Sequence, residues 1–188
     1  MPNKAFFLDR DGTINIDYDF VHLPEQWDFC PGAVDAIKWM NQNDYKVIVV
    51  TNQSGIARGH FTMETVLELH RWVDSQLALV DARIDGWYIA PWHPNFHGDL
   101  NPDLLKLRKP NTGMFEQAAA EHDIDFLQSH MAGDKLSDIK PAISLDMQAY
   151  LIRSRFTPDW DRDFIKKHAI PEFEHLGELL LHLKQNGF

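Results

Sequence analysis

The sequence of 188 residues contains a single cysteine, Cys30. One cysteine excludes an intramolecular disulfide and any zinc site that needs several cysteines. Long apolar runs are also missing, and the longest is far too short to span a bilayer. The first ten residues, MPNKAFFLDR, place only a short apolar stretch before a charge, which is no secretory signal. These absences predict a cytoplasmic protein that does not associate with membranes.

Basic residues are outnumbered, with 18 Lys and Arg against 28 Asp and Glu, so the formal net charge is −10 with histidines neutral. Non-specific nucleic-acid binding depends on neutralising phosphates with Lys and Arg, and an acidic surface argues against it. A small phosphorylated substrate remains compatible if a metal ion or local cations supply positive charge. No coiled-coil heptads or unusual apolar stripe indicate self-association.

What the chain does have is an alternation of strand and helix patterns. Short apolar segments predict strands over residues 4–8, 46–50, 85–90, 130–132 and 149–153. Helical spacing predicts helices over residues 33–43, 62–80 (with Thr62 as N-cap), 113–122, 136–145 (with Pro141 near the first turn) and 175–184. This order predicts an α/β fold, a Rossmann-like parallel sheet with helices on both faces, in a single domain over residues 1–188.

Two long segments, residues 14–31 and 91–110, lack a regular pattern. Loops of about twenty residues in a compact domain are usually functional or disordered. We therefore expect both segments to lie near whatever the protein binds.

The most informative segment follows the first predicted strand and reads Asp9-Arg10-Asp11-Gly12-Thr13. In an extended segment residues i and i+2 face the same way, so Asp9 and Asp11 should converge while Arg10 points elsewhere. Gly12 then allows a sharp exit from the strand. A pair of solvated loop acids is the plain alternative. The carboxyl end of a buried strand, however, is where open α/β sheets place their ligands.

Three further polar segments occupy equivalent places: TNQSG at 51–55, RKP at 108–110 and GDKLSD at 133–138. Each alone has an ordinary structural explanation, namely an N-cap loop, a solvated basic turn and a helix-capping aspartate. The ordered set of all four segments is far more specific than any one of them.

This set resembles the haloacid dehalogenase superfamily of phosphatases. The stretches FLDRDGTIN, VVTNQSGIARG, RKP and GDKLSD are similar to the small-cap branch that contains heptose 1,7-bisphosphate phosphatases and the histidinol-phosphatase domain. The likeness covers about residues 5–153. It implies a minimal cap over the sheet, hydrolysis of phosphate monoesters, and a monomer.

The resemblance also implies catalytic roles. Asp9, anionic at neutral pH, would attack phosphorus and form an aspartyl-phosphate. Asp11 would act as general acid and then base, and for this its pKa should be raised by burial beside Asp9. Thr51 and Lys109 would surround the phosphoryl oxygens with a donor and a positive charge. Mg²⁺ would be held by Asp9, the backbone carbonyl of Asp11, and Asp134.

Substrate-binding positions carry over in the same way. They are Asp17, Tyr18, Asp19, Phe20, Asn52, Gln53, Ser54, Arg108 and Lys135. Arg108 would help to recognise a second, distal phosphate, a role that suits a guanidinium. Lys135 would lie near the phosphate and the metal.

A structural zinc found in many members of the branch is expected to be absent. Its Cys-x-His and Cys-x-Cys ligands correspond here to Ala90, Trp92, Leu105 and Leu107, all apolar. We expect Trp92, Leu105 and Leu107 to form a small hydrophobic cluster instead. A different metal site in the loop could draw on His93, His97, Asp99 and Asp103.

The resemblance thus implies a Mg²⁺-dependent phosphatase acting on a small phosphorylated sugar, heptose 1,7-bisphosphate. Histidinol phosphate or another small phosphomonoester is the nearest alternative. A DNA 3′-phosphatase of the same superfamily and a non-catalytic binding module are more remote ones. Because Asp9, Asp11, Lys109 and Asp134 are all present, a catalytic protein is favoured.

Overall fold

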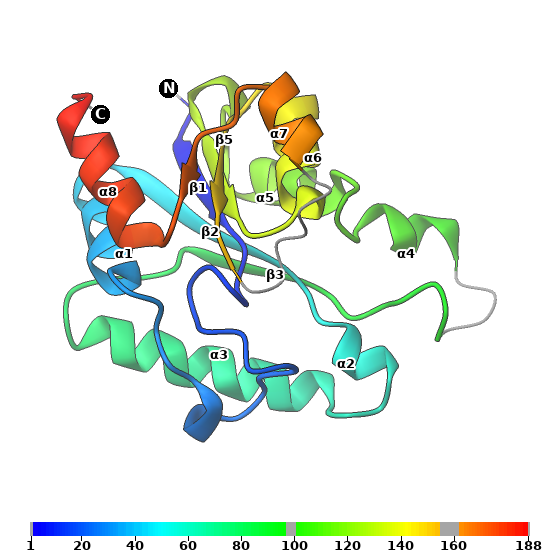
Figure 1. Ribbon diagram of the computed structural model, residues 1–188. Coiled ribbons are helices and arrows are strands. Elements are labelled where there is room, and N and C mark those ends of the chain that lie inside the picture. The colour runs from blue at the N-terminus through cyan, green and yellow to red at the C-terminus, as the bar shows by residue number, and fades with distance from the viewer. Residues whose placement is uncertain (1, 97–100, 155–161, 188) are drawn as a thin grey trace.

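The computed structural model describes residues 2–96, 101–154 and 162–187, and its centre is a parallel six-stranded sheet (Figure 1). The strands lie in the order β3-β2-β1-β4-β5-β6. Their bounds are β1 Lys4–Leu8, β2 Tyr45–Asn52, β3 Gly86–Ala90, β4 His130–Gly133, β5 Gln148–Ile152 and β6 Glu172–Phe173. The Rossmann-like parallel sheet expected from the sequence is confirmed.

The strand order reverses direction at β1, which has β2 on one side and β4 on the other. Leu8 of β1 is in register with Val49 of β2 and with Ala132 of β4. The residues that follow these strands, Asp9 and Asp134, therefore emerge side by side at the carboxyl edge. Ligands of open α/β sheets bind in the crevice at such a switch point.

Helices cover both faces of the sheet, as expected (Figure 1). The helices are α1 Ala33–Gln42, α2 Ser54–Ala57, α3 Met63–Ala78, α4 Pro102–Lys106, α5 Gly113–His122, α6 Leu136–Ser144, α7 Arg162–Lys167 and α8 Leu176–Gln185, with 3₁₀ turns η1 Pro24–Gln26 and η2 Phe126–Gln128. One buried cluster joins α1, α3 and α8 to Phe6 and Leu8 of β1. A second joins α5, α6 and α7 to Ala5 and Phe7.

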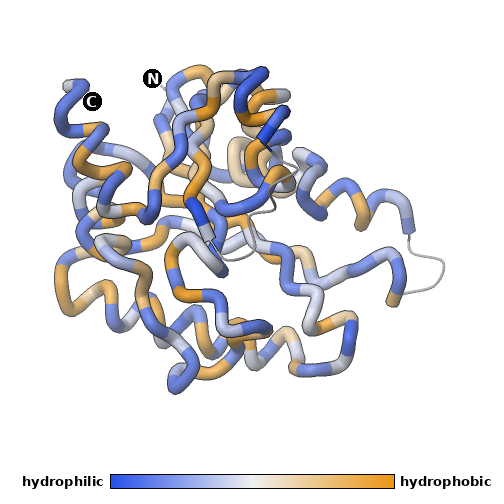
Figure 2. The backbone as a smooth tube through the Cα atoms, viewed as in Figure 1, coloured by the Kyte–Doolittle hydropathy of each residue, from blue (hydrophilic) through white to orange (hydrophobic). Residues whose placement is uncertain are grey.

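Successive residues of β1 thus enter opposite cores, which explains why the central strands are apolar throughout. Figure 2 shows hydrophobic colour along the central strands and polar colour over most of the surface loops. None of the helices within the described ranges is both long and apolar enough to cross a bilayer.

Each element predicted from periodicity is present, with ends within about three residues. Thr62 caps α3, since its hydroxyl accepts a hydrogen bond from the Thr65 amide at 3.2 Å. Pro141 lies inside α6 rather than near its first turn, which corrects the expectation. The short elements α2, α4, α7, β6, η1 and η2 were not predicted, because they are too short to show a period.

Candidate active site

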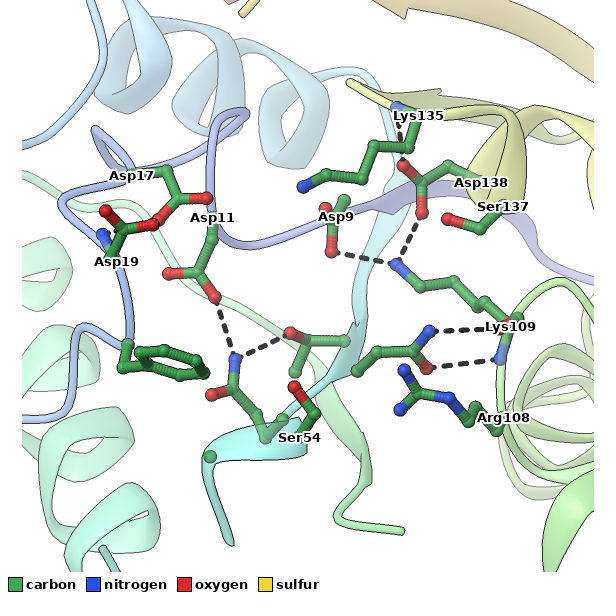
Figure 3. Close-up of a pocket in the computed structure, with 15 residues that line it drawn as sticks. Asp9, Asp11, Asp17, Asp19, Ser54, Arg108, Lys109, Lys135, Ser137 and Asp138 are labelled. Atoms are coloured by element: carbon green, nitrogen blue, oxygen red, sulfur yellow. Dashed lines mark hydrogen bonds and ion pairs between the residues drawn. The ribbon is translucent and has the colours of Figure 1, made fainter. Parts of the chain in front are cut away.

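A cavity of about 330 Å³ opens at the carboxyl edge of the sheet (Figure 3). Its walls come from the segment after β1, the end of β2, the start of α2 and α6, and the RKP segment. The lining residues are Asp9, Asp11, Asp17, Asp19, Phe20, Thr51, Asn52, Gln53, Ser54, Gly55, Arg108, Lys109, Lys135, Ser137 and Asp138. The four motifs and the segment at 14–31 therefore meet at one place, as the sequence pattern predicts.

Asp9 lies on the floor of the cavity, paired with Lys109. The Lys109 Nζ donates to Asp9 Oδ1 at 2.8 Å and to the Val50 carbonyl at 2.6 Å, and lies 2.6 Å from Asp138 Oδ1. Asp9, Lys109 and Asp138 are 6%, 3% and 1% exposed, so the charges interact away from bulk water. Burial alone would lower the pKa of Lys109, but the carboxylates of Asp138 and Asp9 outweigh it and raise the pKa.

Asp9, Asp134 and Asp138 form the one group of three potential metal ligands within the described ranges. One ligand atom from each lies within 4.8 Å of the others. Burial, followed by the charge of Asp9, raises the pKa of both Asp134 and Asp138. Three buried carboxylates at this spacing repel one another unless cations separate them. An all-oxygen set of this kind suits Mg²⁺, so the residues present fit the ion that the resemblance implies.

Two glycines, Gly12 and Gly133, lie against the carboxylates of the acidic cluster and leave room for them. Gly12 has a φ of +83°, and a Cβ there would lie 2.5 Å from Asp134 Oδ2. A Cβ on Gly133 would lie 2.4 Å from the Asp138 side chain. Any other residue at either position would push a carboxylate out of the cluster. The sharp exit that Gly12 was predicted to allow is confirmed by its positive φ.

Arg10 does not point away from the aspartate pair, contrary to expectation. Its guanidinium forks onto the Asp11 carboxylate, with Nη2 to Oδ1 at 2.9 Å and Nε to Oδ2 at 3.0 Å. Nη2 also donates to the Val21 carbonyl at 2.6 Å, and Nη1 lies 3.3 Å from Nε2 of His70. The alternation of a strand fixes only the direction of Cβ, and a side chain as long as arginine can fold back.

The expected rise in the pKa of Asp11 is likewise wrong. Burial by itself would raise this pKa, but the Arg10 charge and hydrogen bonds from Arg10, Asn15 and Gln53 outweigh burial and lower it. The amides of Asn15 and Gln53 donate to Asp11 at 3.1 and 2.8 Å. In this conformation Asp11 is therefore an ionised, four-fold hydrogen-bonded carboxylate.

The segment after β2 braces the cavity through its amide side chains. Gln53 Nε2 bridges Asp11 Oδ2 and the Thr51 hydroxyl, at 2.8 and 2.9 Å. Asn52 forms two hydrogen bonds with the backbone of Lys109, accepting from its N–H at 3.1 Å and donating to its carbonyl at 3.0 Å. Both amides were predicted to contact substrate, and the structure also gives them roles in holding Asp11 and Lys109.

The predicted substrate residues meet at the cavity with one exception. Asp17, Asp19 and Phe20 line one side, and Figure 3 shows Arg108 on the opposite side from Asp17 and Asp19. Tyr18 does not line the cavity, because its hydroxyl donates to Asp28 at 2.9 Å and half of the residue is exposed.

Lys135 enters the cavity beside the acidic cluster. Its Nζ lies 3.2 Å from Asp134 Oδ1, and its backbone N–H donates to Asp138 Oδ2 at 2.9 Å. Burial would lower the pKa of Lys135, but the carboxylates, Asp134 foremost, outweigh it and raise the pKa. Lys135 therefore carries a positive charge inside the cavity, beside the acidic cluster.

Asp138 and Ser137 were not assigned a role from the sequence, although both line the cavity. A signal was available, because the GDKLSD segment places Asp138 in the first turn of the helix that begins directly after Asp134 and Lys135.

Apolar residues occupy the four positions that correspond to the zinc ligands of the branch. Ala90 is fully buried on the sheet face that carries α5, and Trp92 and Leu107 pack against the same cluster. Leu105 is half-buried and does not belong to that cluster. Of the alternative loop ligands, His97 and Asp99 fall outside the residues that the structure describes. The absence of zinc remains a prediction.

Comparison with known proteins agrees with this geometry. Residues 4–164 match the family described as Polynucleotide kinase 3 phosphatase. The D-glycero-beta-D-manno-heptose-1,7-bisphosphate 7-phosphatase of Haemophilus influenzae is 39% identical over 184 residues, 97% of this chain and 100% of the relative. The enzyme of the same name from Escherichia coli K12 is 41% identical over 143 residues, 76% of this chain and 75% of the relative.

Among solved structures, the D,D-heptose 1,7-bisphosphate phosphatase from B. bronchiseptica, complexed with magnesium and phosphate, superposes with a TM-score of 0.81. It is 29% identical and covers 97% of this chain and 99% of its own. A putative HAD-like phosphatase from Mesorhizobium loti is 33% identical with a TM-score of 0.73, covering 80% of this chain and 73% of its own. The chain therefore belongs to the phosphatase family that residues 4–164 match and, within the haloacid dehalogenase superfamily, to the branch of the heptose bisphosphate phosphatases.

Proposed function

We propose that this protein is a Mg²⁺-dependent phosphatase that removes the 7-phosphate of D-glycero-D-manno-heptose 1,7-bisphosphate through an aspartyl-phosphate. One observation carries the proposal: a buried Asp9 carboxylate, paired with Lys109 and grouped with Asp134, lies on the floor of a cavity in a chain related over its full length to such enzymes. The proposal also holds that the protein is a cytoplasmic monomer with a single domain.

In the first half of the reaction, Asp9 attacks phosphorus and the bond from phosphorus to the sugar oxygen breaks. An aspartate needs no base for this, because it is already ionised at neutral pH. Lys109 and Thr51 line the same cavity as Asp9, and in this proposal they contact the phosphoryl oxygens and balance their charge. Mg²⁺, held by Asp9, the Asp11 carbonyl and Asp134, would when bound supply further positive charge to the same oxygens.

In the second half, a water molecule attacks the aspartyl-phosphate and gives up a proton. The lowered pKa of Asp11 favours its ionised form, which can accept that proton as a base. To protonate the departing sugar oxygen in the first half, Asp11 must first take up a proton. The oxygen that takes up this proton then loses one of the hydrogen bonds that it accepts here. We therefore assign this conformation to the base form of Asp11, with Arg10 and Gln53 holding it.

The test is phosphate release from both C1 anomers of heptose 1,7-bisphosphate, with histidinol phosphate alongside. We expect preferential cleavage of a heptose anomer, loss of activity in EDTA, and loss in Asp9→Asn, which keeps the shape of the nucleophile and removes its charge. Cleavage of histidinol phosphate alone would retain the mechanism and replace the substrate. Full activity of Asp9→Asn would contradict the aspartyl-phosphate.

A nucleic-acid 3′-phosphate is a second candidate substrate, because the matching family is described as Polynucleotide kinase 3 phosphatase. The net charge of −10 disfavours it, since binding to a phosphate backbone needs a basic surface. A 3′-phosphorylated oligonucleotide in the same assay decides between the two. We expect no release from the oligonucleotide under conditions where the heptose bisphosphate is consumed.

A further inference from the structure

His70 of α3 is a buried histidine that neither the sequence motifs nor the proposed mechanism uses. It is 3% exposed, and its Nε2 lies 3.3 Å from Nη1 of Arg10. Neither His70 nor Arg10 is among the described residues that line the cavity. Arg10, however, forks onto the Asp11 carboxylate, which does line it, so His70 is joined to the site through Arg10.

The contact with Arg10 determines which form of the histidine ring is present. A guanidinium donates from each of its nitrogens and is not deprotonated in proteins, so Nε2 of His70 has to accept. An imidazole that accepts at Nε2 is neutral and carries its proton on Nδ1. Burial, followed by the charge of Arg10, lowers the pKa of His70 to about 3, which agrees with a neutral ring.

Nδ1 of His70 is buried and has no hydrogen-bond partner among the residues that the structure describes. A buried N–H group without a partner costs free energy. The polar contact that the structure gives this ring is the one with Arg10, so that contact is the reason we find for a histidine at this position.

An indole ring holds the imidazole in its orientation. The ring centroids of His70 and Trp87 lie 3.8 Å apart, and the two planes are 18° from parallel. Trp87 belongs to β3, and its Nε1 donates at 3.1 Å to Asp74, which lies one helical turn after His70 on α3. The stack is therefore tied to both α3 and β3, and it presents the Nε2 edge of the imidazole to Arg10.

The acceptors around Arg10 divide its nitrogens among them. Nη2 donates to the Asp11 carboxylate and to the Val21 carbonyl, and Nε donates to Asp11. Within the described ranges, Nη1 has only the His70 ring as its partner. Because Arg10 is fully buried, loss of that acceptor would leave an unpaired N–H of a charged group away from water. The guanidinium would then turn toward another acceptor and loosen its grip on Asp11.

We propose that His70 is a positioning residue, which holds Arg10 so that the Asp11 carboxylate stays oriented as the base for the attacking water. This inference rests on the proposed function, in which Asp11 acts as that base. As the water oxygen bonds to phosphorus, its proton passes to Asp11 and the bond from phosphorus to Asp9 breaks. His70 and Arg10 neither give nor take a proton. Loss of His70 should therefore slow hydrolysis of the aspartyl-phosphate and leave its formation unchanged.

The test uses p-nitrophenyl phosphate, because p-nitrophenolate leaves without being protonated and only the second half of the reaction then needs Asp11. Rapid mixing measures both halves, since p-nitrophenolate appears when the aspartyl-phosphate forms and inorganic phosphate when it is hydrolysed. The variant is His70→Phe, which removes the acceptor and keeps a ring against Trp87. We expect an unchanged rate of p-nitrophenolate formation and phosphate release slowed about 10- to 100-fold, part of what a general base contributes.

His70→Gln provides the rescue, because its side-chain oxygen can accept from Arg10 near the place of Nε2. It should recover most of the rate of phosphate release, although it loses the ring stack. His130→Phe is the matched control, since His130 is also buried, at 4% exposed, and stacks on Phe6 at 4.5 Å, but does not line the cavity. It should slow neither half of the reaction.

Equal slowing of both halves in His70→Phe would mean that His70 only supports the fold, and would overturn the inference. So would an unchanged rate of phosphate release, or a His70→Gln variant as slow as His70→Phe. If the wild-type protein cleaved p-nitrophenyl phosphate but not heptose 1,7-bisphosphate, the proposed substrate would fail, and the same two rates would still decide the role of His70. Absence of release from both substrates would overturn both proposals.

Discussion

Lys109 is the residue on which the charge balance of the site depends most. It compensates Asp9 and Asp138, both within 2.8 Å of its Nζ, at a position only 3% exposed. Removing one partner of a buried ion pair leaves an uncompensated charge, which typically destabilises by about 3–5 kcal/mol. We predict that Lys109→Met loses that much free energy of unfolding in EDTA and lowers kcat about 10²- to 10³-fold with Mg²⁺. Denaturant unfolding and steady-state kinetics measure the two effects.

The matched control is Lys106→Met, in the same segment. Among the residues that the structure describes, Lys106 pairs only with Asp103, and both side chains are largely exposed. Surface pairs of this kind contribute little, so stability and kcat should be unchanged. Equal effects of the two substitutions would show that the loop, and not the buried charge, determines the result.

Gly12 permits a contact that no other residue allows. We predict that Gly12→Ala lowers the free energy of unfolding by roughly 2–5 kcal/mol, because it adds both the strain of a positive φ and overpacking against Asp134. Displacement of Asp134 should also raise the Mg²⁺ concentration needed for half-maximal activity. Denaturant unfolding and a magnesium titration of activity check the two parts.

Gly59→Ala separates strain from the clash. Gly59 has a φ of +74°, but a Cβ there would meet nothing within 4 Å. Only the backbone strain remains, so we expect a loss of about 1–2 kcal/mol. A loss as large in Gly59→Ala as in Gly12→Ala would exclude the contact with Asp134 as the cause.

At the scale of elements, the N-cap of α3 offers a direct test of sequence-based reasoning. Thr62→Ala removes the hydroxyl that accepts from the Thr65 amide and should cost about 1 kcal/mol of unfolding free energy. Thr112 occupies the same position at α5, but its hydroxyl donates to Glu116 at 2.7 Å and does not cap the helix. Thr112→Ala should therefore cost less than about 0.5 kcal/mol in the same denaturant titration. Equal losses would contradict the cap.

Length decided which elements could be predicted. Long, periodic segments such as α3 and β2 were predicted near their observed ends, because burial imposes a repeat that the sequence displays. Helices of four to six residues, such as α2 and α4, make little more than one turn and leave no repeat to detect. Yet α2 places Ser54 and Gly55 at the cavity, so a helix that lines the site was among the hardest elements to foresee.

At the scale of the whole molecule, buried neutral histidines couple stability to pH. Burial lowers the pKa of His130 to about 4, and burial with the charge of Arg10 lowers that of His70 to about 3. An unfolded histidine titrates near 6.5, so below about pH 6.5 the unfolded chain binds protons that the folded chain does not. Stability contributed by neutral His130 is therefore complete above pH 6.5 and is lost as pH falls toward 4.

Unfolding measured from pH 7.5 to 4.5 should show this as a slope of about 1.4 kcal/mol per pH unit for each histidine. His130 stacks on Phe6 at 4.5 Å and lies 3.2 Å from the Tyr150 hydroxyl. Its replacement in His130→Gln should lower stability at pH 7.5 and reduce the acid slope by about that amount. An unchanged slope in His130→Gln would exclude this histidine as a source of the acid sensitivity.

The amino-acid sequence alone predicts the parallel α/β sheet, most of its elements and most of the residues that meet at its carboxyl edge. These follow from local rules: the periods of helix and strand, and the place of ligands at the ends of parallel strands. Asp9, Asp11, Lys109 and Asp134 stood out because each belongs to a short motif beside a recognisable strand or helix, and the resemblance of these motifs to the haloacid dehalogenase superfamily supplied their expected roles.

The charge states and the pairing of these groups depend on the three-dimensional packing. Asp11 has a lowered and not a raised pKa because Arg10 folds back onto it and Gln53, 42 residues away, donates to it. Asp138 belongs to the site because Lys109, distant in sequence, lies against it. The charge state of a buried group depends on every dipole and charge within a few ångströms, and those neighbours come from segments that sequence order leaves unrelated.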